Sequence, residues 1–145
     1  MNIFYWSPFI SNVATVSSVM RSADSLVRYS NESINVSLID SIGEWKDQKK
    51  KINPKINIIK LNNNNFYNLL PRGGFIRSRL SYLIIFFLNF NKLKNLINNE
   101  KPDYLIIHLM TSLPIFLTLF FKSKTKIILR LSGLPKLNII INKIN

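Results

Sequence analysis

The chain has 145 residues, 47% of them apolar, so it is long enough for one hydrophobic core, too short for two ordinary domains, and not disordered. It has no cysteine, which excludes disulfides and thiolate chemistry, and a single histidine with seven carboxylates argues against a protein-built metal site. The net charge of +13 is unevenly distributed. Residues 1–40 carry two basic and three acidic side chains, whereas residues 41–145 carry eighteen basic and four acidic side chains. A surface this basic favours phosphate-rich partners such as anionic lipid headgroups, nucleotides or nucleic acid. The joint abundance of Lys, Asn, Ile and Phe is also what AT-rich codons produce, so part of the charge can be compositional drift.

Membrane and export signals are weak. Residues 1–10 lack the basic start of a signal peptide. The two longest apolar runs, 82–88 and 113–121, fall short of the ~20 residues that cross a bilayer. We therefore expect a cytoplasmic protein that lies on a membrane surface rather than one that spans it.

The first forty residues predict a strand, a helix and a second strand. Residues 2–7 are apolar and aromatic, and a proline follows them. Ser11 or Asn12 is placed to cap a helix over 13–30, whose apolar residues recur at spacings of three and four. Residues 34–39 alternate between apolar and polar and predict the second strand.

The middle of the chain predicts one strand and one long helix. Residues 41–55 form a polar, lysine-rich connection, and 56–61 predict a third strand. Residues 66–75 contain a proline and a Gly-Gly pair and should stay irregular. A helix follows over 76–98.

The last part predicts two more strands. Residues 103–108 are an apolar run ended by the histidine, which is typical of a strand buried on both faces. Residues 112–121 predict a short apolar helix, 126–131 a fifth strand, and 137–144 the start of another helix. Strand and helix alternating in this way predict one α/β domain over 1–145: a Rossmann-like parallel sheet of about five strands, with helices on both faces. Right-handed crossovers favour strand order 3-2-1-4-5, with the switch point between strands one and four.

Polar residues at the carboxyl ends of these strands are the candidate site, because open parallel sheets bind ligands there. His108 is the candidate catalytic group, since an imidazole can donate a hydrogen bond or help to hold developing charge. The alternative is a strand-end histidine satisfied by a backbone carbonyl. The candidates for ligand binding, through an anion or a sugar oxygen, are the polar residues, with one glycine, after strands one, four and five, for which plain capping or turn formation is the alternative: Ser11, Asn12, Thr15, Thr111, Ser112, Arg130, Ser132 and Gly133.

A second candidate is the basic cluster that precedes the long helix. It contains three arginines and a glycine pair beside aromatic residues, which suits a phosphate or a membrane interface. The residues are Arg72, Gly73, Gly74, Arg77 and Arg79. The alternative is a solvated loop leading into a core helix.

Three segments, 7–16, 101–108 and 129–137, resemble the N-terminal half of bacterial glycosyltransferases, the family 4-like enzymes of the GT-B fold that build lipopolysaccharide, capsule or other surface glycans. The resemblance implies that this chain is the acceptor-binding domain, and that a nucleotide-sugar donor is held by a C-terminal domain the chain lacks. No pair of glutamates has the Glu-x7-Glu spacing common in that second domain, and the Gly-Gly pair that many relatives carry after strand one is missing. No cofactor is expected on this chain itself.

The resemblance therefore predicts the acceptor half of an enzyme that transfers a sugar to a lipid-linked or cell-surface glycan, located on the cytoplasmic face of the inner membrane. The chain's end within a predicted helix suggests a truncated gene product, or one half of a split enzyme whose donor domain is a separate chain. In related enzymes a histidine near position 108 meets the reacting sugars. The alternative hypothesis is a non-enzymatic basic module that docks on anionic membranes. Nucleic-acid binding would rest on the charge alone, and no recognised motif supports it.

Overall fold

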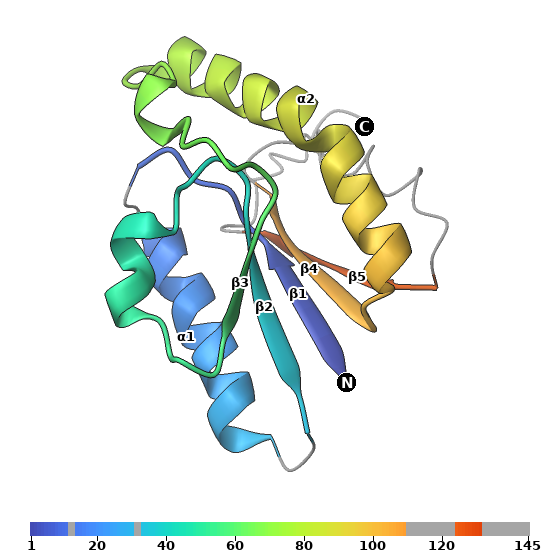
Figure 1. Ribbon diagram of the computed structural model, residues 1–145. Coiled ribbons are helices and arrows are strands. Elements are labelled where there is room, and N and C mark those ends of the chain that lie inside the picture. Colours follow the sequence, from blue (N-terminus) through green and yellow to red (C-terminus); the bar gives the residue numbers. More distant parts are fainter. Residues whose placement is uncertain (12–13, 31–32, 110–123, 132–145) are drawn as a thin grey trace, which may run out of the picture.

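The computed structural model describes residues 1–11, 14–30, 33–109 and 124–131. It contains one parallel five-stranded sheet in the order β3-β2-β1-β4-β5 (Figure 1). The strands, in chain order, are β1 (Asn2–Trp6), β2 (Asn35–Asp40), β3 (Asn57–Lys60), β4 (Tyr104–Leu109) and β5 (Lys126–Leu131). The sheet order and the all-parallel pairing confirm the predicted α/β, Rossmann-like fold.

The two long helices cover opposite faces of the sheet (Figure 1). Helix α1 (Ala14–Tyr29) packs Val16, Val19 and Ala23 onto the face that carries Tyr5 of β1. Helix α2 (Phe75–Glu100) packs onto the other face, which carries Trp6. Successive strand residues point to opposite faces, so each central strand supplies both cores.

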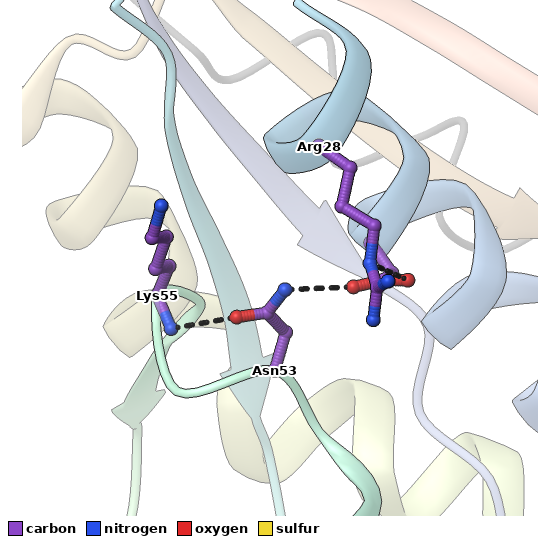
Figure 2. A network of polar contacts seen from close by, with 4 residues as sticks. Arg28, Asn53 and Lys55 are labelled. Atoms are coloured by element: carbon purple, nitrogen blue, oxygen red, sulfur yellow. Dashed lines mark hydrogen bonds and ion pairs between the residues drawn. The ribbon is translucent and has the colours of Figure 1, made fainter.

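A small polar network ties α1 to the connection that leads into β3. Asp24 of α1 accepts a hydrogen bond of 2.8 Å from the side-chain amide of Asn53 and pairs with Arg28 at 2.7 Å (Figure 2). The carbonyl oxygen of the Asn53 side chain accepts the backbone N–H of Lys55 at 3.0 Å. Asn53 thereby holds the turn before β3 against the helix, at the end of the sheet remote from the carboxyl edge.

The connection after β2 is more ordered than its polar sequence predicts. It contains a 3-10 helix, η1 (Lys46–Lys51), and buries Ile42, Glu44 and Trp45. Gly43 has φ of 92°, and a Cβ there would lie 2.6 Å from the Asn65 side chain, so this turn requires glycine. The lysine-rich sequence predicts a solvated connection, but in the structure this loop folds back onto the core and buries several of its side chains.

Helix α2 has two halves with different neighbours. Leu93 and Ile97 of the second half pack on the sheet, together with Phe86 near the middle of the helix. The first half instead lies over the loops beyond the carboxyl edge, where Ile85 joins a cluster with Ile10 and two other loop residues. The predicted irregular stretch before the helix includes one 3-10 turn, η2 (Tyr67–Leu69).

Two of the predicted helices, over 112–121 and 137–144, lie outside the described residues. Within the described part of the chain, no helix is both long and apolar enough to cross a membrane.

A buried carboxyl pair closes the loop after β2. The Glu44 carboxyl accepts backbone N–H groups from Ser41 and Ile42 at 2.7–3.0 Å, and Asp40 accepts the N–H of Gly43 at 2.6 Å. Burial, reinforced by the neighbouring Asp40 carboxyl, raises the pKa of Glu44 well above its ordinary value. The folded chain therefore keeps the proton of Glu44 to a higher pH than the unfolded chain does.

This proton makes a testable contribution to stability. Because the folded-state pKa is the higher one, the contribution is complete below the unfolded pKa and is lost as pH rises through the folded pKa. In Glu44→Gln the amide mimics the neutral acid, so we expect its unfolding free energy, measured by urea denaturation, to fall less than that of the parent chain as pH rises above the ordinary Glu pKa of 4.5. Glu100→Gln, at an exposed position, is the matched control and should follow the parent. Parallel curves for Glu44→Gln and the parent would contradict the shared proton.

Candidate functional site at the switch point of the sheet

The site is built around a hydrogen bond between Ser7 and His108. Strands β1 and β4 pair in parallel, with Trp6 opposite Ile107, so the next residue of each chain falls at the same edge of the sheet. The Oγ atom of Ser7 lies 3.0 Å from Nδ1 of His108. Both side chains are 4% exposed. The order of the strands makes this edge the switch point, where parallel sheets commonly bind ligands.

The loop after β1 is held rigidly by two apolar residues that follow Ser7. Phe9 makes edge-to-face contacts with the rings of Trp45 and Tyr67, at centroid distances of 5.0 and 6.1 Å. Ile10 is buried in the cluster beneath the first half of α2. Because both anchors are buried, the backbone carrying the Ser7 hydroxyl has little freedom to move away from the imidazole.

Arg130 supplies a positive charge beside the imidazole. In the β4–β5 pairing Arg130 stands opposite His108, so Ser7, His108 and Arg130 form one row across three neighbouring strands. The guanidinium of Arg130 donates a hydrogen bond to Ser18 of α1 at 3.1 Å. This contact directs the arginine toward α1 and fixes it at the edge of the sheet.

The environment of His108 keeps its imidazole neutral. Burial, with a smaller contribution from the Arg130 charge, lowers the pKa of His108 to about 4. At neutral pH the ring therefore carries one N–H and one lone pair. A neutral imidazole next to a fixed cation can hydrogen-bond a sugar hydroxyl and can tolerate negative charge nearby, which suits a ligand that combines hydroxyl groups with phosphate.

A groove of about 1060 Å³ runs along α1, and of the three residues in the row Arg130 alone lines it. Arg130 lines it together with Arg21, and its floor includes Tyr5, whose hydroxyl is paired with Ser22 at 2.9 Å. The groove continues along the helix toward Tyr29, away from the carboxyl edge. It gives Arg130 and Ser18 a solvent-facing side.

The predicted site residues divide into three groups. His108 and Arg130 are brought together, as expected from the strand order. Ser11 is exposed and Thr15 is half-buried in the first turn of α1. The hydrogen bond of His108 goes to Ser7 and not to either of them. The remaining predicted acceptor-binding residues lie outside the described part of the chain: Asn12, Thr111, Ser112, Ser132 and Gly133.

The predicted basic cluster is exposed at the start of α2. Arg72 lies 4.2 Å over the ring of Tyr67 and donates a hydrogen bond to that residue's carbonyl oxygen, and Arg79 lies 4.7 Å over the ring of Phe75. Gly73 and Gly74 have φ of 83° and 75°, and both are exposed. Among the described residues, no recorded contact connects this cluster with the Ser7–His108 pair, so it is a separate surface.

Sequence reasoning missed Ser7, Ser18 and the buried carboxyls. Ser7 directly follows the last residue of β1 and sits at the same edge as His108, which is a signal that the strand boundary alone could have given. Ser18 lies within α1, and no sequence pattern indicated that it would accept a hydrogen bond from Arg130. The described residues hold no group of three or more His, Cys, Asp or Glu side chains able to bind a metal ion. Asp40 and Glu44 instead bond the backbone of their own loop.

The depressed pKa of His108 predicts a pH-dependent loss of stability. As pH falls from about 6.5 to about 4, the unfolded chain takes up a proton that the folded chain refuses, so stability drops in this window by up to about 3 kcal/mol. His108→Gln has no such proton and should lose less stability over the same range in urea denaturation. Equal losses in the two chains would show that the imidazole is not kept neutral by the fold.

Comparison with known proteins adds no assignment: no protein-family model matches the chain, and no curated protein matches its sequence.

Proposed function

We propose that this chain is the acceptor-binding half of a glycosyltransferase that passes a sugar from a nucleotide-sugar to a lipid-linked or cell-surface glycan. The observation that carries the proposal is the buried Ser7–His108 hydrogen bond at the switch point, with Arg130 in the same row. It supports the expectation drawn from the resemblance in the loop after β1 and in the segments ending at His108 and Leu137.

The chemistry of the row fits an acceptor better than a donor. A neutral imidazole hydrogen-bonds a hydroxyl group without the cost of burying a second charge. The Arg130 guanidinium suits the phosphate of a lipid-linked sugar, because guanidinium–phosphate contacts are charge-assisted. The loop after β1 lacks the glycine pair that would let its backbone approach a donor diphosphate.

Transfer of a sugar needs a second domain that binds the nucleotide-sugar donor and faces the acceptor domain. The residues that the structure describes form one parallel sheet, and no glutamate pair in the sequence has the spacing typical of a donor domain. We therefore expect the chain as given to bind acceptor and to leave nucleotide-sugars unhydrolysed. Its partner in catalysis would be a donor domain that closes over the row.

A second surface supports membrane association. The first half of α2 exposes four apolar residues at helical spacings of three and four: Ile76 (81% exposed), Leu80, Leu83 and Phe87 (71%). Arg77 and Arg79 are exposed beside them. An apolar stripe flanked by arginines is the pattern of a helix that lies in the headgroup region of an anionic membrane.

The position of this stripe links the two parts of the proposal. The first half of α2 lies over the loops at the carboxyl edge of the sheet, the same edge that holds His108 (Figure 1). A chain docked by α2 on the cytoplasmic leaflet would thus keep its acceptor site near the membrane, where a lipid-linked sugar is found. The alternative, a non-enzymatic membrane-docking module, would bind the membrane through α2 and would bind no ligand at Ser7 and His108.

Acceptor binding is testable with two probes: a short-chain prenyl-diphosphate-linked sugar and deacylated lipopolysaccharide core. By calorimetry or NMR titration at least one should bind the parent chain, and His108→Ala should weaken binding about fivefold, the loss expected for one hydrogen bond of ordinary strength. Asn98→Ala, in the last turns of α2, serves as a distant control. Binding of neither probe, or sugar-nucleotide turnover by this chain alone, would contradict the proposal.

Membrane docking is testable with vesicles. The parent chain should sediment with vesicles containing phosphatidylglycerol and far less with phosphatidylcholine alone. The Arg77→Ala/Arg79→Ala variant should bind about 30-fold more weakly, since each arginine near an anionic surface contributes about 1 kcal/mol. The matched control is Lys49→Ala/Lys50→Ala, which removes two exposed charges from η1. An equal loss in both variants would show attraction by net charge, with no docking face on α2.

A further inference from the structure

The buried hydroxyl of Ser7 needs an acceptor for its hydrogen. Ser7 is 4% exposed, and among the described residues its hydroxyl has one recorded side-chain partner, Nδ1 of His108. A buried O–H without an acceptor is costly, so burial favours donation of this hydrogen to the imidazole. Nδ1 can accept it only when that nitrogen carries no hydrogen of its own.

This assignment fixes the tautomer of the ring. With Nδ1 as acceptor, the single hydrogen of the neutral imidazole is on Nε2. Nε2 is then a hydrogen-bond donor, and Nδ1 is closed to any ligand by the Ser7 hydroxyl. The same ring with the hydrogen on Nδ1 would offer a lone pair at Nε2 and would meet a sugar hydroxyl as an acceptor instead.

We propose that Ser7 is a positioning residue that locks His108 in the Nε2–H tautomer, so that the imidazole presents a donor to an oxygen atom of the acceptor sugar. This inference rests on the proposed function for the identity of the ligand, and on the Ser7–His108 geometry for the state of the ring. Ser7 acts through His108 and makes no contact with the reacting sugar.

Three structural features support a lock of this kind. Parallel pairing of β1 with β4 holds the two backbones in register as far as Trp6 and Ile107. The buried anchors Phe9 and Ile10 hold the loop that follows Ser7. The Arg130 guanidinium, opposite His108 on β5, disfavours a second proton on the ring. The imidazole is therefore restricted in position and in protonation, and the Ser7 hydroxyl selects between its two neutral forms.

The chain's single histidine makes the tautomer directly measurable. In a two-bond 1H–15N correlation spectrum of the full 145-residue chain at pH 7, Nδ1 should resonate as an unprotonated nitrogen and Nε2 as a protonated one. In Ser7→Ala the ratio of Nδ1–H to Nε2–H should rise about fivefold, as loss of one ordinary hydrogen bond implies. Ser7→Thr keeps the hydroxyl and should restore the parent ratio.

The controls separate this effect from a general disturbance of the fold. Ser37→Ala makes the same change at a buried serine of β2, opposite Phe4, and should leave the imidazole shifts as in the parent. Amide spectra of all variants establish that the fold is kept. A parent chain with its hydrogen on Nδ1, or a Ser7→Ala spectrum unchanged from the parent, would overturn the proposal.

Binding of the prenyl-diphosphate-linked sugar tests the link to function. Ser7→Ala should weaken binding several-fold, and should weaken it no further when His108→Ala is already present, because Ser7 acts only through the ring. Additive losses would show direct contact by Ser7 and overturn the positioning role. If the spectra are as expected but no glycan probe binds, the proposed function fails while the tautomer lock stands. If glycans bind but the tautomer ratio is unaffected by Ser7→Ala, the lock fails alone.

Discussion

Parallel pairing of β1 with β4 is the constraint on which the site depends. These strands are about a hundred residues apart in sequence, and no local interaction would bring Ser7 and His108 together. Once the register is set, the first residue beyond β1 and the fifth residue of β4 are neighbours at the carboxyl edge. Strand β5 adds Arg130 to the same row. Sheet topology therefore brings these three polar side chains together at one edge.

Two buried titratable groups at this edge have opposite effects on stability. The lowered pKa of His108 reduces the stability of the fold as pH falls toward 4, whereas the raised pKa of Glu44 reduces it as pH rises. The two groups lie after different strands and serve different purposes: Glu44 closes its own loop, and His108 faces the switch point. Together the two groups narrow the pH range in which the fold is most stable. Apolar residues at the same two positions would not make the stability depend on pH.

The sequence was sufficient for the fold because its apolar runs are short, regularly spaced and separated by helix or turn signals. Strand order then followed from right-handed crossovers, and His108 and Arg130 from their places at strand ends. The strand boundary placed Ser7 at the carboxyl edge, but its pairing with His108 could not be read from the sequence, because the partner of a small hydroxyl is set by register rather than by a motif. The sequence also did not predict the structure of the loop after β2. Its many lysines indicated a solvated segment, but Trp45 and Glu44 are buried. The composition of a segment indicates its average exposure, whereas the burial of each side chain depends on its own position in the fold.

An amide chemical-shift map of the full chain tests the central claim most directly. The uniformly 15N-labelled chain would be titrated with the prenyl-diphosphate-linked sugar and compared with the same titration by inorganic diphosphate. The account predicts that the sugar probe perturbs residues 7–10 and the amides of His108 and Arg130, with much smaller effects from diphosphate alone. Perturbations confined to the lysines of η1, or identical for the two probes, would show charge-driven binding and contradict a sugar site at the switch point.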